Sequence, residues 1–233
     1  MNTIQALRNL LETATFVDMT HLMEQGMPYW PTQAAFEAET GDHQSKGDMD
    51  YWRKITMSEH TGTHIDALSH FIEGAENVDQ IPVSRIMGRA VNIDVTDTPP
   101  LGLVSEQRIR EFEKQNGEIC EGDLVFFRFG WDKKWGVGEE GAAFLKDWPG
   151  LSKEAAVYLR EKKIKAVGTD ALAIDVFGSA DNPVHVELLG HGINVIENIN
   201  RLWELPVHFA VIGLPCRLKD GSGSPLRLIA LTD

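Results

Sequence analysis

Four side chains that can bind a metal ion or move a proton gather between residues 60 and 71, in the segment HTGTHIDALSHF. They are His60, His64, Asp66 and His70, and even numbers of positions separate them. On a helix, Asp66 would point nearly opposite to His60 and His64, whereas on an extended chain all four side chains point to one side. Two imidazoles and a carboxylate are a common ligand set for a catalytic metal ion that keeps open coordination positions.

The residues between these side chains predict a strand end that runs into a loop. Three β-branched residues disfavour a helix here: Thr61, Thr63 and Ile65. A straight strand would hold His60 and His64 about 13 Å apart. That separation is too large for one ion with bonds of about 2 Å. We therefore expect Gly62 to turn or bulge the backbone so that the ligands converge.

The alternative is that these histidines have no common role. A single histidine is more often a surface residue or a hydrogen-bonded core residue than a metal ligand. Here, three of the chain's eight histidines fall within residues 60–70 and are interleaved with Asp66. This density favours a metal site.

The segment HTGTHIDALSHF resembles the signature HxGTHxDxPxHF of the metal-dependent cyclase family, which includes bacterial kynurenine formamidases and isatin hydrolases. Leu68 stands where the family usually has proline. The resemblance supports the metal site and supports His70 as the acid/base group. It also implies that Glu197 reaches the metal centre, and that Trp30 of a Trp-Pro pair lies near the pocket. Trp30 would then stack on a flat substrate, although a tryptophan of the core is an equal alternative.

The stretch PVHVELLGHGINVIE, residues 183–197, is similar to one in kynurenine formamidases that has two adjacent histidines. In our alignment the second of these serves a second metal. His185 matches the first, and Val186 replaces the second. We therefore expect one divalent ion per chain, with Glu197 bound to it directly or through water. His185 would orient a ligand, contact the substrate or cap the helix.

Length and charge set limits on the class of protein. The 233 residues predict one domain over residues 1–233, and a net charge of -13 disfavours binding to nucleic acid or an anionic membrane. No apolar stretch approaches a membrane span of about 18 residues. The start of the chain lacks the features of a signal peptide, and two cysteines are too few for a disulfide framework. We expect a cytoplasmic enzyme that acts on a small molecule as a homodimer or higher homo-oligomer.

Periodicity predicts alternating helices and strands. Helices are expected at residues 2–13, 105–115, 153–163 and 183–189. Strands are expected at 16–20, 51–57, 90–95, 124–129, 166–170, 193–196, 209–215 and 226–231, with an exposed turn at 220–225. This order predicts an α/β or mixed α+β fold with a mixed sheet. The family resemblance implies a swivelling β/β/α-type domain.

The predicted site is suited to hydrolysis of a C–N bond. A metal ion lowers the pKa of bound water to about 7 and polarises a carbonyl. A neutral His70 would take the water's proton and return it to the leaving nitrogen, with no covalent enzyme intermediate. Its alternative role is as an outer or second-metal ligand. Mixed nitrogen and oxygen ligands suit manganese and zinc alike.

These residues leave several functions open. The first is hydrolysis of a small cyclic amide, most like isatin hydrolase; the alternative is kynurenine formamidase activity, which cleaves an arylformamide. A non-catalytic metal-binding relative is a further alternative, although it would be expected to have lost His70. A serine hydrolase is disfavoured because the chain has no GxSxG motif. A structural zinc site is disfavoured because neither cysteine lies near the motif.

Overall fold

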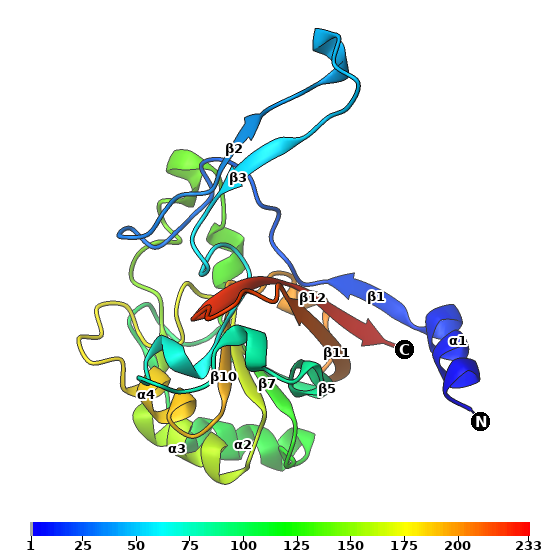
Figure 1. Ribbon diagram of the computed structural model, residues 1–233. Coiled ribbons are helices and arrows are strands. Elements are labelled where there is room, and N and C mark those ends of the chain that lie inside the picture. The colour runs from blue at the N-terminus through cyan, green and yellow to red at the C-terminus, as the bar shows by residue number, and fades with distance from the viewer. Residues whose placement is uncertain (1) are drawn as a thin grey trace.

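The computed structural model describes residues 2–233, and its centre is a mixed eight-stranded sheet in the order β1-β12-β11-β5-β7-β9-β10-β4 (Figure 1). Strand β12 also pairs with β4, so the sheet closes into a barrel-like form. The strands of this sheet are β1 (Thr15–Asp18), β4 (His64–Asp66), β5 (Met87–Asp94), β7 (Leu124–Arg128), β9 (Ala166–Thr169), β10 (Asn194–Glu197), β11 (His208–Pro215) and β12 (Gly223–Thr232). Two small sheets join β2 (Glu37–Thr40) to β3 (Arg53–Thr56), and β6 (Leu103–Val104) to β8 (Gly150–Leu151).

The helices are α1 (Thr3–Thr13), α2 (Glu106–Asn116), α3 (Lys153–Glu161) and α4 (Pro183–Leu189). The last three lie together on one side of the sheet (Figure 1). Ser105 and Ser152 begin α2 and α3, and each side chain accepts a backbone N–H of the first turn. The mixed α+β fold is confirmed. Within residues 2–233, no helix is long and apolar enough to cross a membrane.

Alternation along β7 divides the apolar interior into two cores. Leu124 and Phe126 pack with residues of β4, β11 and β12 inside the barrel-like sheet. Val125 and Phe127 point the other way and pack against the apolar faces of α2, α3 and α4. Successive side chains of a strand face opposite sides, so one continuous apolar run supplies both cores.

The expected turn at residues 220–225 is partly wrong. β12 begins at Gly223, and residues 223–225 are buried and paired with β4. The turn residues DGSGSP conceal this strand start because glycine, serine and proline are typical of turns. Residues 41–52 form the tip of the β2–β3 hairpin, which projects from the body of the molecule (Figure 1).

The closure of the sheet positions the histidine motif. β4 is only three residues long, yet it pairs antiparallel with β10 on one side and with β12 on the other. A short strand held on both edges has its backbone polar groups satisfied and little freedom to shift register. The side chains of β4 are therefore held relative to two neighbouring strands at once.

Candidate functional site

The pairing of β4 with β10 places His64 directly opposite Glu197. Side chains of opposed residues in an antiparallel pair lie on the same face. Asp66 is two residues beyond His64 and so shares this face. The Nε2 atom of His64 lies 3.5 Å from Asp66 Oδ1 and 3.5 Å from Glu197 Oε2, and all three residues are buried.

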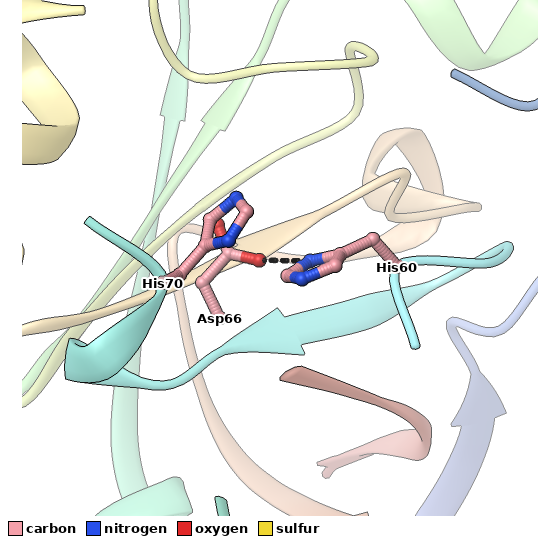
Figure 2. Close-up of side chains that lie close together, drawn as sticks. All are labelled: His60, Asp66 and His70. Atoms are coloured by element: carbon pink, nitrogen blue, oxygen red, sulfur yellow. Dashed lines mark hydrogen bonds and ion pairs between the residues drawn. The ribbon is translucent and has the colours of Figure 1, made fainter. Parts of the chain in front are cut away.

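The predicted turn before β4 is present. Gly62 has a φ of 63°, a conformation that glycine adopts without strain. As a result, the rings of His60 and His64 have centroids 5.2 Å apart, and His60 Nδ1 lies 2.8 Å from Asp66 Oδ1 (Figure 2). The His70 ring, from the short helical turn after β4, lies 4.0 Å from the His60 ring. The structure thus brings the four residues of the motif together.

The geometry of these atoms fits a divalent metal ion. Ligand atoms about 2.1 Å from one ion at tetrahedral angles lie about 3.4 Å apart. The two contacts of His64 Nε2, at 3.5 Å, are close to this spacing and too long for good hydrogen bonds. The Oδ2 atom of Asp66 is buried without a hydrogen-bond partner. An unpaired buried carboxylate oxygen is costly unless a cation or water satisfies it.

The electrostatics of the site also favour a cation. Burial opposes charge on His64, yet Asp66 and Glu197 outweigh it and raise the pKa of His64 above its ordinary value. Burial alone would raise the pKa of Asp66. Three neighbouring imidazoles instead hold this pKa well below its ordinary value. Asp66 therefore retains its negative charge and stabilises positive charge beside it, which is what a divalent ion requires.

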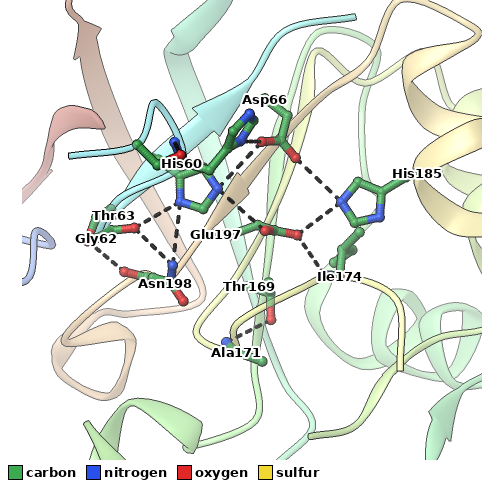
Figure 3. Close-up of polar contacts among 12 residues, drawn as sticks. His60, Gly62, Thr63, Asp66, Thr169, Ala171, Ile174, His185, Glu197 and Asn198 are labelled. Carbon is green, nitrogen blue, oxygen red and sulfur yellow. Dashed lines mark hydrogen bonds and ion pairs between the residues drawn. The ribbon is translucent and has the colours of Figure 1, made fainter. Parts of the chain in front are cut away.

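His185 reaches the same cluster from α4. Its Nε2 atom lies 3.1 Å from Glu197 Oε1 and 3.4 Å from Asp66 Oδ2 (Figure 3). Its Nδ1 atom lies 2.6 Å from Asp175 Oδ2, and Asp175 also accepts the backbone N–H of Val184 and of His185. Burial opposes charge here too, but these carboxylates, Asp175 foremost, raise the pKa of His185 well above its ordinary value.

Contrary to the prediction from the sequence, Val186 does not stand where a ligand of a second ion would be. The Val186 side chain is 45% exposed on the outer face of α4, whereas His185 is buried and faces the site. A histidine at position 186 would point away from the carboxylates, because consecutive helix residues project about 100° apart. Val186 therefore removes no side chain from this site, and the number of ions remains a proposal.

A pocket of about 210 Å³ opens beside the cluster. Its lining combines the candidate site residues with apolar and amide side chains: Trp30, Gln33, His60, His64, His70, Phe71, Leu172, Ala173, Asn182, His185 and Glu197. Trp30 is 40% exposed and contacts Trp148 edge-on, with ring centroids 6.0 Å apart. Trp30 is thus a wall of the pocket rather than a fully buried core residue. Burial lowers the pKa of His70 to about 4, so its imidazole is neutral at pH 7.

Several residues at the site were not assigned from the sequence. Asp175, an acidic residue beyond strand β9, fixes His185, while Asp170 at the end of the same strand only accepts backbone N–H groups of residues 129–131. Gln33 lines the pocket, and its Oε1 accepts a hydrogen bond from Ser58. Phe71 stacks on His185 at 4.7 Å. The position of Asp175 after a strand is a sequence signal, whereas the others depend on chain segments that only the fold brings together.

The fit of the His60 ring against β12 gives a testable prediction. A Cβ atom on Gly223 would lie 2.5 Å from His60 Cε1 and 2.9 Å from His60 Nδ1. Gly223→Ala must therefore displace this imidazole, and we expect metal affinity to fall about 10-fold or more, as when a ligand loses its support. Titration calorimetry with Zn²⁺ measures the effect.

Gly213→Ala is the matched control, because its added Cβ would lie 2.4 Å from Ile86 Cγ2, among the barrel core residues. It should reduce stability and leave Zn²⁺ affinity unchanged. An unaltered Zn²⁺ affinity in Gly223→Ala would show that His60 is not a ligand.

Known proteins are similar to this chain in sequence and in fold. Kynurenine formamidase of Bacillus cereus is 29% identical over 219 residues, covering 94% of this chain and 98% of that protein. Isatin hydrolase of Roseibium aggregatum is 31% identical over 207 residues, covering 82% of this chain and 78% of that protein.

Among solved structures, isatin hydrolase A from Labrenzia aggregata bound to benzyl benzoate is 29% identical, with a TM-score of 0.90 over 99% of both chains. An isatin hydrolase bound to the product analogue thioisatinate is 27% identical, with a TM-score of 0.89 over 100% of this chain and 99% of that one. The family model described as Putative cyclase matches residues 17–176. With its histidine motif, its fold and this match in agreement, the chain belongs to the cyclase family.

Proposed function

We propose that this protein hydrolyses the amide C–N bond of a small cyclic amide and opens isatin to isatinate. Its class, an amidohydrolase acting on C–N bonds other than peptide bonds, follows from its family and its relatives. The observation that carries the substrate proposal is the pocket itself, which is small, has aromatic walls and lies directly beside the imidazoles and carboxylates. Residues 1–233 would act as one metallohydrolase domain.

The proposed ligands are His60, His64 and Asp66, with Glu197 completing the shell directly or through water. One manganese or zinc ion per chain is proposed. Such an ion would activate water and polarise the amide carbonyl. His185 would contact the substrate at the pocket wall, where Phe71 stacks on its ring. Elemental analysis showing two ions per chain would contradict the proposed count and would make His185 a ligand instead.

His70 is the proposed acid/base group. It lines the pocket, and its imidazole is neutral at pH 7 because burial lowers its pKa to about 4. A neutral imidazole has a free nitrogen lone pair to accept a proton from water and can then donate that proton to the leaving nitrogen. Among residues 2–233, no carboxylate hydrogen-bonds to the His70 ring as Asp66 does to the His60 ring, which leaves the His70 imidazole available for proton transfer.

Pocket size and charge favour isatin over N-formylkynurenine. A volume of about 210 Å³ lies below the range of about 300–1,000 Å³ typical of sites for drug-sized ligands. Among the described residues that line the pocket there is no lysine or arginine to pair with the carboxylate of an amino acid. Isatin is a flat, compact ring system without a carboxylate, and Trp30 offers it a stacking surface. Kynurenine formamidase activity is the second candidate, since relatives of that name match 94% of this chain.

The substrate proposal predicts a larger kcat/KM for isatin than for N-formylkynurenine. Both hydrolyses change ultraviolet absorbance, so initial rates of the metal-loaded protein can be measured directly. Trp30→Ala should raise KM for isatin more than it lowers kcat, because it removes a stacking surface and no reacting group. A kcat/KM that is higher for N-formylkynurenine would reject the substrate proposal while leaving the amidohydrolase class intact.

The role of His70 predicts that His70→Ala and His70→Asn keep the ion and lose most of the rate. General acid/base groups contribute about 100- to 10,000-fold. The measurements are kcat and metal content on the same preparation. His191→Ala is the control, because His191 is an exposed histidine whose ring contacts Arg160 of α3 and Glu187 of α4. A near-normal kcat would exclude the role, and loss of the ion would place His70 among the ligands.

We also propose a homodimer or higher homo-oligomer in the cytoplasm. No residue of α1 is buried, and its exposed apolar residues include Leu7 and Leu11. The projecting β2–β3 hairpin exposes Met49 and Trp52 as well. Apolar surface of this kind is usually covered by a partner. Light scattering coupled to gel filtration should give at least twice the mass of one chain, and a monomer would contradict the proposal.

A further inference from the structure

The carbonyl of Gly62 is the meeting point of two buried hydrogen bonds beside the candidate metal ligands. It lies 2.9 Å from His64 Nδ1 and 2.9 Å from Asn198 Nδ2 (Figure 3). A carbonyl oxygen only accepts hydrogen bonds, so both nitrogens must donate. The proton of His64 is therefore on Nδ1, and the amide NH₂ group of Asn198 faces Gly62.

This arrangement determines which nitrogen of His64 can bind an ion. With the proton on Nδ1, the lone pair is on Nε2, the atom 3.5 Å from both Asp66 Oδ1 and Glu197 Oε2. The direction of the Gly62 carbonyl thus selects the tautomer and the ring orientation. Gly62 has a φ of 63° in a turn, so its peptide group lacks the support of a strand ladder. Asn198 supplies a second anchor for that carbonyl.

Asn198 is itself held firmly. It directly follows Glu197, has a φ of 55°, and is only 2% exposed. Its backbone N–H donates to Ala171 O at 3.1 Å, and its backbone carbonyl accepts from Thr63 Oγ1 at 2.6 Å. The Thr63 hydroxyl in turn accepts the N–H of His21 at 2.9 Å. One residue therefore ties the turn before β4 to the end of β10.

We infer that Asn198 is a positioning residue, which fixes the coordinating nitrogen of His64 by holding the Gly62 carbonyl. The inference rests on the proposed metal-dependent function. Asn198 does not line the pocket, and it acts on the site through the orientation of His64. Asn198 also holds Glu197, its neighbour in the chain, opposite His64. It does so because its side chain donates to the Gly62 carbonyl and its backbone carbonyl accepts from the Thr63 hydroxyl.

A purely structural role for Asn198 makes a different prediction. Asparagine is one of the few residues that tolerate a positive φ, so Asn198 could be required by the turn alone. Asn198→Gly separates the two roles, because glycine keeps the backbone conformation and removes only the amide group. If the turn were the whole role, this variant would bind metal normally.

The test is calorimetric titration of the metal-free protein with Zn²⁺ alone. Asn198→Gly should bind Zn²⁺ about 10- to 100-fold more weakly than the wild type, the usual effect of removing a group that orients a metal ligand. Asn92→Ala is the matched control: Asn92 is a buried asparagine on β5 whose amide donates to Leu202 O and Leu205 O. It should lower the stability of the fold and leave Zn²⁺ affinity unchanged.

A spectroscopic readout complements the affinity. In the Zn²⁺-loaded wild type, ¹⁵N-edited NMR should show a protected Nδ1–H proton on His64, and Asn198→Gly should lose this protection. Asn198→Ala serves as a second variant if Asn198→Gly does not fold, because it removes the donor to Gly62 and leaves no acceptor in place of the amide beside His64 Nδ1. It too should lose the protected proton.

Wild-type Zn²⁺ affinity together with a protected Nδ1–H in either folded variant would overturn the inference. A wild type that binds no Zn²⁺ would instead overturn the metal-dependent function on which the inference rests. The two failures are therefore distinguishable by the wild-type titration.

Discussion

The antiparallel pairing of β4 with β10 is the constraint on which the site depends. It sets His64 against Glu197, and two-residue periodicity adds Asp66 to the same face. A shift of one residue in this register would turn the charged side chains toward the barrel core, where Ile65 now packs. The register is secured because β12 pairs with the other edge of β4 and closes the sheet. The chemistry of the site and the closure of the sheet therefore depend on the same three-residue strand.

Much of this could be predicted from the sequence, because local patterns carry it. The even spacing of the motif residues predicted an extended segment, and Gly62 predicted the turn that brings His60 back to Asp66. The helices and most strands follow from periodicity, as does the continuous apolar run that supplies both cores from β7. Glu197 was predicted to enter the site, and it is buried there beside His64.

What could not be predicted depends on contacts between distant segments. The start of β12 at Gly223 looks like a turn, because its pairing with β4 is not encoded in residues 220–225. The orientation of α4 decides that His185, and not position 186, faces the carboxylates, and Asp175 is what fixes that orientation. Asn198 resembles an ordinary turn residue until its amide is seen against Gly62. Each of these features requires knowledge of which strands and helices are neighbours.

The central claim is that the clustered imidazoles and carboxylates hold a divalent ion that the reaction requires. The most direct measurement is amide hydrolysis by the purified protein before exhaustive chelation, after it, and after metal is restored, with metal content determined at each stage. The account predicts that activity is lost with the ion and returns when Mn²⁺ or Zn²⁺ is added back to the wild type but not to His64→Ala. Full activity in a wild-type protein that retains no metal would contradict it.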